Sequence, residues 1–125
     1  MSAVTTRALA RDALETAYGV DGQRLLPWPA LNAPFEGAWC VVRAGTSSVP
    51  HTHQEYELFI AISGSAVLAA GGERIPFAAG DMAHVRPGTE HQLINDGEGD
   101  FEMYSLWWDA DMSARFDARH REETA

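Results

Sequence analysis

Between residues 38 and 108 the sequence alternates short apolar runs with turns rich in glycine, and this alternation constrains the fold more than any other feature. Many short runs of Val, Ile, Phe and Tyr at close spacing are typical of an antiparallel barrel or sandwich. The turn Ala70-Gly71-Gly72-Glu73 predicts a tight hairpin between two of the runs. The expected strands are Trp39–Arg43, Leu58–Ile62, Ser65–Ala69, Arg74–Phe77, His91–Ile94 and Phe101–Trp108.

The segments that flank this region have a different character. Thr6–Tyr18 is expected to form a short helix, because Thr6 can cap it, apolar residues recur at helical spacing and Gly19 can end it. Residues 27–37 contain three prolines, which predict an extended lead-in. Met112–Arg121 is expected to form a second short helix. We therefore predict one domain over residues 1–125, with the barrel core at about 38–108.

Composition narrows the classes of partner. A net charge of −9 and a pI near 4.8 argue against binding to nucleic-acid phosphates or to anionic membranes. The single cysteine, Cys40, cannot form an intramolecular disulfide. The sequence shows neither a signal peptide nor an apolar stretch of membrane-spanning length, so a soluble cytoplasmic protein is expected.

The spacing of three histidines and one glutamate points to a metal. His51 and His53 are two residues apart, so on a strand both side chains point to the same face. Glu57 precedes the next apolar run, and His91 heads a later strand after a Pro-Gly turn. Imidazole and carboxylate donors together suit a first-row divalent transition metal better than Mg²⁺ or Ca²⁺. Four protein ligands would leave coordination positions open for catalysis.

The wider pattern around these residues resembles the cupin motifs. The segment from Gly45 to Gly64 resembles the first motif, G-x5-H-x-H-x3-E-x6-G, at every fixed position. The segment from Gly80 to Asn95 resembles the second, G-x5-P-x-G-x2-H-x3-N, with one departure, because Arg86 stands at the first proline. The departure puts only the local loop geometry in question, since Pro87-Gly88 still provides the turn.

This resemblance implies a fold, a metal and a range of activities. The fold would be an all-β cupin barrel (a double-stranded β-helix or jelly roll) with short flanking helices. One divalent ion, Zn, Fe, Mn or Ni, would bind to His51, His53, Glu57 and His91. The expected function is a metal-dependent enzyme that acts on a small organic molecule in a biosynthetic pathway, by Lewis-acid rearrangement or lyase chemistry or by dioxygenation. A fainter likeness gives a more specific alternative. That likeness, over His51–Glu57 and Phe101–Asp109, is to zinc cupins that work beside methionyl-tRNA-synthetase-like proteins in nitrogen–nitrogen bond formation. A non-catalytic cupin that binds a small ligand or metal is the other alternative.

Further residues are candidates for a substrate pocket or an interface. Trp39, Tyr104 and Trp107 either line the pocket or fill the core, depending on which face of the sheet they occupy. His84 and His120 are expected to face solvent. A homodimer is predicted, with the Thr6–Tyr18 helix and the proline-rich lead-in as contact elements, because an exposed barrel edge needs cover.

Overall fold

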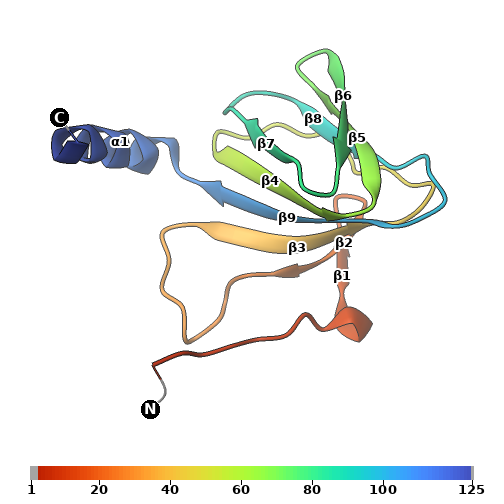
Figure 1. Cartoon of the computed structure of the whole chain (residues 1–125), viewed down its shortest axis with the longest axis horizontal. Coiled ribbons are helices and arrows are strands. Elements are labelled where there is room, and N and C mark those ends of the chain that lie inside the picture. Colours follow the sequence, from red (N-terminus) through yellow and green to blue (C-terminus); the bar gives the residue numbers. More distant parts are fainter. Residues whose placement is uncertain (1–2, 125) are drawn as a thin grey trace.

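Two antiparallel sheets and one C-terminal helix make up the computed structural model, which describes residues 3–124 (Figure 1). One sheet has six strands in the order β1-β2-β3-β9-β4-β7, and the other has three in the order β6-β5-β8. The strands are β1 (Glu15–Ala17), β2 (Val20–Arg24), β3 (Glu36–Val42), β4 (Tyr56–Ser63), β5 (Ser65–Ala70), β6 (Glu73–Ala78), β7 (Met82–Val85), β8 (His91–Ile94) and β9 (Phe101–Trp108). Every strand pair among the described residues runs antiparallel, which confirms the predicted fold class.

The core lies between the two sheets. Side chains alternate between faces along a strand, and the buried residues of β3, β4 and β9 share the inward face. Phe59, Phe77 and Phe101 come from β4, β6 and β9, and the Phe77 ring lies between the other two, with centroids 6.5 Å from Phe59 and 5.8 Å from Phe101. Phe101 is fully buried and Leu68 of β5 nearly so. Both sheets therefore contribute apolar side chains to a single core.

The predicted hairpin at residues 70–73 is confirmed. Ala70 pairs with Glu73, and the two glycines between them both have positive φ angles, 56° and 82°. This is the backbone that a two-residue hairpin turn requires, and glycine adopts it without steric strain. The turn fixes the register of β5 against β6.

The predicted helix at Thr6–Tyr18 is wrong. Only Arg11–Ala13 forms a single 3₁₀ turn, and β1 pairs with β2 from Glu15 to Ala17. The segment before it is extended and held by the end of β2, since the Arg7 guanidinium donates to the carbonyl oxygen of Arg24 at 3.2 Å. Three apolar residues gave too narrow a stripe to stabilise a helix, whereas strand pairing satisfies the backbone of residues 15–17.

The C-terminal helix is confirmed, and it is longer than predicted. Helix α1 spans Ala110–Thr124, against the expected Met112–Arg121. The Asp109 side chain caps it, accepting hydrogen bonds from the backbone N–H groups of Asp111 and Met112 at 2.8 and 3.0 Å. Among the residues described, no helix is both long and apolar enough to cross a membrane. Figure 1 shows α1 standing away from the two sheets.

Candidate metal centre

Backbone pairing between two distant segments brings the four predicted ligands together. His51 and His91 form an isolated bridge in which each N–H donates to the carbonyl oxygen of the other, at 3.2 and 3.1 Å. His91 opens β8, and Glu57 lies in β4. The N–H of Gly88 donates to the carbonyl oxygen of His53 at 2.8 Å, which ties the turn before β8 to the first ligand segment. The departure from the motif at Arg86 therefore leaves the ligand turn in place.

The donor atoms converge on one point. One ligand atom from each of His51, His53, Glu57 and His91 lies within 4.8 Å of the others. The imidazole rings crowd together, with the His51 and His91 ring centroids 4.4 Å apart. Glu57 and His91 are buried, and the other two histidines are half-buried. The centre is therefore closed on the side of the core and open on the side of His51 and His53.

Hydrogen bonds to the backbone fix how the three imidazoles present their nitrogens. Each Nδ1 faces a carbonyl oxygen two residues away in sequence: that of Val49 for His51, Glu55 for His53 and Thr89 for His91, at 3.0, 3.2 and 2.9 Å. A carbonyl oxygen only accepts, so Nδ1 carries the proton in each ring. The Nε2 atoms are then left with free lone pairs, which is the tautomer that binds a metal.

The Glu57 carboxylate is oriented by a buried serine. Its Oε2 accepts a hydrogen bond from the Ser105 hydroxyl at 2.5 Å, and its Oε1 lies 3.1 Å from Nε2 of both His53 and His91. Burial alone would raise the pKa of Glu57, but the His91 imidazole and the Ser105 hydroxyl outweigh it and hold that pKa below its usual value. Burial likewise lowers the pKa of His91, and Glu57 with the Thr89 carbonyl raises it overall.

The donor set fits a single metal ion. Nε2 of His91 is buried and makes no hydrogen bond, although Oε1 of Glu57 is only 3.1 Å away. With Nδ1 protonated, the free Nε2 lone pairs and the carboxylate all present negative charge density to the same point. Such an arrangement is stabilised by a cation, and three imidazoles with one carboxylate suit a first-row divalent metal.

Tyr18 completes the open side, and the sequence analysis missed it. It has a positive φ of 52°, which is rare for a residue other than glycine, and together with Gly19 it turns β1 into β2. Its ring lies against the His51 imidazole with centroids 5.4 Å apart, while the residue remains 68% exposed. The Tyr-Gly pair between two short runs of mixed polarity is the sequence signal for this turn. The helix expected from the sequence placed that pair at its end instead.

The three aromatic pocket candidates lie on opposite faces of the six-stranded sheet. Trp107 is directly across from Glu57 in the β4–β9 register and so shares the inward face with the ligands. Trp39 and Tyr104 pair with each other on the outward face, with their rings edge to face at 6.2 Å. Of the three, Trp107 lies on the side of the metal centre, with the Arg24 guanidinium over its ring at 5.5 Å.

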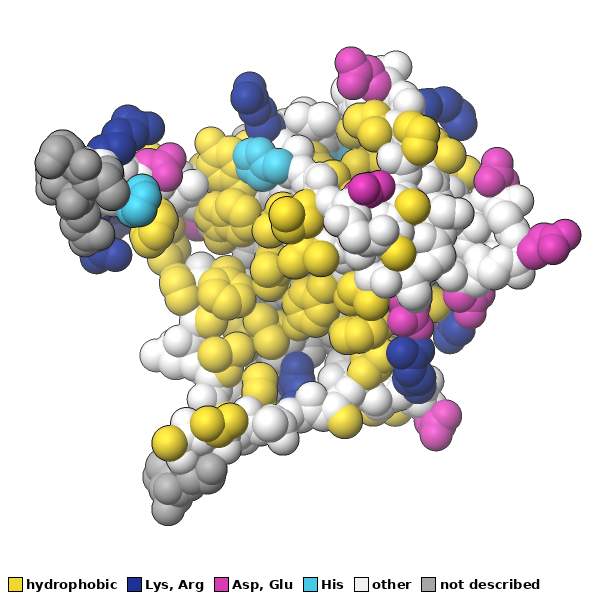
Figure 2. Space-filling model, viewed as in Figure 1, with side chains coloured by type: hydrophobic (Ala, Val, Ile, Leu, Met, Phe, Trp, Pro, Cys, Tyr) yellow, Lys and Arg dark blue, Asp and Glu magenta, His cyan; other side chains and the backbone are white. Residues whose placement is uncertain are grey.

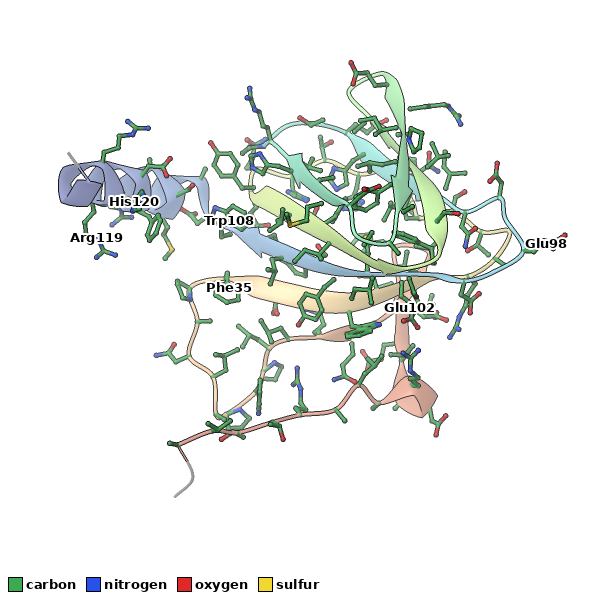
Figure 3. All side chains as sticks on the ribbon, viewed as in Figure 1. Phe35, Glu98, Glu102, Trp108, Arg119 and His120 are labelled. Carbon is green, nitrogen blue, oxygen red and sulfur yellow. The ribbon has the colours of Figure 1, made fainter. Side chains whose placement is uncertain are left out.

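The remaining candidates are separate from the centre. His84 is exposed on the outward face of β7 and stacks on Tyr56, with centroids 5.4 Å apart. His120 lies on α1 (Figure 3). Cys40 is buried in the core, and burial together with the charge of Glu57 raises the pKa of its thiol to about 12. Two surface cavities, of about 660 and 670 Å³, are lined by other residues, beside β2 and beneath α1.

Comparisons with known proteins agree with this geometry. Residues 38–108 match the family model described as a cupin domain. A cupin 2 conserved barrel domain protein from Salinispora arenicola CNS-205 is 49% identical over 95% of this chain and 100% of its own, with a TM-score of 0.84. A protein from Photorhabdus luminescens is 41% identical over 97% of this chain and 99% of its own, with a TM-score of 0.82. A predicted oxalate decarboxylase from Thermotoga maritima is 26% identical over 71% of this chain and 79% of its own, with a TM-score of 0.65.

Proposed function

This chain belongs to the cupin domain family, and from that premise we propose that it is a metal-dependent enzyme acting on a small organic molecule. The observation that carries the proposal is the preorganisation of the centre. Three Nδ1–H groups are held by backbone carbonyls, so three Nε2 atoms and the Glu57 carboxylate point to one site. A site that only filled the core would not align four donors in this way.

The ion, when bound, would supply Lewis acidity, or electron transfer if it is redox-active. The chain's own residues would do the rest. Ser105 holds Glu57 in its binding orientation from within the core. Tyr18 forms one wall of the open side beside His51, and Trp107 lies across from Glu57 with Arg24 over its ring. An aromatic wall beside the open side suits a small, partly apolar molecule.

One comparison supports a small carboxylic acid as the first substrate class to test. Arg24 does not mark a site for that acid, because its guanidinium is paired with the Glu36 carboxylate at 3.0 Å. The relative from Thermotoga maritima is described as a predicted oxalate decarboxylase. Oxalate and short 2-oxo acids therefore belong in the first screen.

Elemental analysis of protein purified without a metal-affinity tag tests the metal directly. We expect about one equivalent of a transition metal in the wild type and in His84→Ala, and a large loss in His53→Ala. His84 is the matched control because it is an exposed histidine on the outward face of the sheet. Since changes in residues that only orient the ligands cost about 10- to 100-fold in metal affinity, loss of a ligand should cost more. Equal metal contents in all three proteins would refute the ligand assignment.

Activity and binding assays on the metal-loaded protein then distinguish an enzyme from the alternative functions. Turnover of a small acid, with or without oxygen uptake, that disappears in His53→Ala would support the proposal. Tight binding of a small molecule without turnover across the screen would instead support a non-catalytic binding module. Turnover that appears only when a synthetase-like protein is added would support the nitrogen–nitrogen bond-forming version.

A further inference from the structure

The turn between β1 and β2 holds a tyrosine in a backbone conformation that costs free energy. Ala17 pairs with Val20, so Tyr18 and Gly19 form a two-residue hairpin turn, and their φ angles are 52° and 79°. Such a turn favours glycine, asparagine and aspartate, because other side chains crowd the backbone at positive φ. Among the described residues, Tyr18 is the one non-glycine residue with a positive φ. Its side chain therefore stands there against the local preference of the backbone.

Packing in the core does not explain this tyrosine. Tyr18 is 68% exposed, so burial of its ring offsets little of the backbone cost. An exposed aromatic residue by itself means little, and hydrophobic side chains also gather over the middle of the molecule in Figure 2. Tyr18 is different because it combines the disfavoured backbone with a ring that lies against a metal ligand. Residues in disfavoured conformations cluster at functional sites, and this one is beside the candidate metal centre.

Hydrogen bonds fix the turn on the segment that leads to His51. The N–H of Val49 donates to the carbonyl oxygen of Tyr18 at 2.7 Å, and Nδ1 of His51 donates to the carbonyl oxygen of Val49 at 3.0 Å. Gly19 lies so close to this segment that a Cβ there would be 2.8 Å from the Ser47 carbonyl oxygen. The planes of the Tyr18 and His51 rings are 30° apart. The backbone of the turn therefore sets the position of the tyrosine ring relative to the metal centre.

We propose that Tyr18 is a specificity-determining residue of the open side, and that it selects planar, conjugated molecules by stacking on their flat face. This inference rests on the proposed function, because a small molecule must reach the ion. Glu57 and His91 close the opposite side of the centre, so a molecule enters beside the tyrosine ring. Aromatic rings attract each other beyond the gain from buried area, and a saturated ring of the same size lacks this attraction.

A pair of hydroxamates tests the proposal on the Co²⁺-loaded protein without any need for turnover. Benzohydroxamate and cyclohexanecarbohydroxamate have the same metal-binding group and equal numbers of carbon atoms, but only benzohydroxamate has a flat ring. Titration followed by the Co²⁺ absorption bands gives both dissociation constants, and their ratio isolates the contact with the ring. We expect the wild type to bind benzohydroxamate more tightly by about 3- to 10-fold, which corresponds to one aromatic pair.

Three variants assign this preference to Tyr18. Tyr18→Asn removes the ring and suits the positive φ of the turn, so the variant should fold, and the ratio should fall to within about twofold of one. Tyr18→Phe keeps the ring and should keep the ratio. Phe116→Ala is the matched control and should also keep it, because Phe116 is 59% exposed and lies on α1, which stands away from the sheets (Figure 1).

Two outcomes would overturn the inference. A ratio that Tyr18→Asn leaves unchanged, even if both affinities fall, would mean that the ring only supports His51. A Co²⁺ spectrum of the wild type that neither hydroxamate changes would mean that no planar ligand reaches the ion from this side. Failure of the proposed function gives a different result, since an absence of turnover across the substrate screen leaves the ratio of the two dissociation constants as expected.

Discussion

Ser105→Ala should weaken metal binding without removing a ligand. The Ser105 hydroxyl donates to Oε2 of Glu57, and the two residues are 2% and 6% exposed, so water cannot easily replace the bond. Without it the carboxylate keeps Oε1 near His53 and His91 but loses the contact that fixes its rotation. Removing an orienting residue of this kind costs about 10- to 100-fold in metal affinity, which is about 1.4–2.8 kcal/mol.

Competition with a chromophoric chelator at pH 7, with Zn²⁺ and with Co²⁺, measures this change. The control is Ser48→Ala, because Ser48 is also buried and its hydroxyl accepts a hydrogen bond from the Leu93 N–H at 2.8 Å, away from the ligand side chains. Both variants should lose about 1–3 kcal/mol of unfolding free energy in the metal-free protein, since each leaves a buried polar group unpaired. Only Ser105→Ala should lose metal affinity.

Two results would refute this reasoning. Metal affinity of Ser105→Ala within about twofold of the wild type would mean that Glu57 is held by its other neighbours or does not bind the ion. Equal losses of affinity in Ser105→Ala and Ser48→Ala would mean that the effect follows global stability rather than the orientation of the carboxylate.

Further measurements test the turn geometry, the buried thiol and the imidazole donors. Gly64→Ala should lower the unfolding free energy, measured by chemical denaturation, by at least about 3 kcal/mol, because a Cβ there would lie 2.4 Å from the Asp100 carbonyl oxygen. Gly72→Ala should lower it by only about 1–2 kcal/mol, because Gly72 has a similar positive φ but open space around it. Tyr18→Asn should raise the melting temperature of the metal-free protein by roughly 4 °C, since asparagine tolerates positive φ better, and a lower melting temperature would contradict the strain at this turn. The Cys40 thiol, with its pKa raised to about 12, should not react with a disulfide reagent at pH 8 until the protein unfolds. Metal occupancy should fall on acidification, because imidazole binds a metal only when it is neutral, and full occupancy at pH 4 would contradict histidine ligands.

Local patterns determined most of the strands between residues 36 and 108. The six expected runs correspond to β3, β4, β5, β6, β8 and β9, because period-two apolar patterning and glycine turns act over a few residues. The missing strand, β7, is short and its Met82 and His84 face outward to solvent, so its sequence lacks a clear apolar run. At the N-terminus the weak helical pattern did not form a helix, because the segment pairs with β2 instead. Periodicity within one segment gives no information about its pairing with another.

For the metal centre, the ligand types and their spacing were readable in the sequence, since His51 and His53 are neighbours on one face and the motif supplies Glu57 and His91. The sequence alone determined an antiparallel β fold and the four converging donors. Only the tertiary structure decided that Trp107 faces inward while Trp39 and Tyr104 face outward, that Ser105 orients Glu57, and that Tyr18 lies over His51. The physical reason is that strand parity and cross-strand register depend on hydrogen-bond pairing between segments far apart in the chain, and a shift of one residue exchanges the two faces.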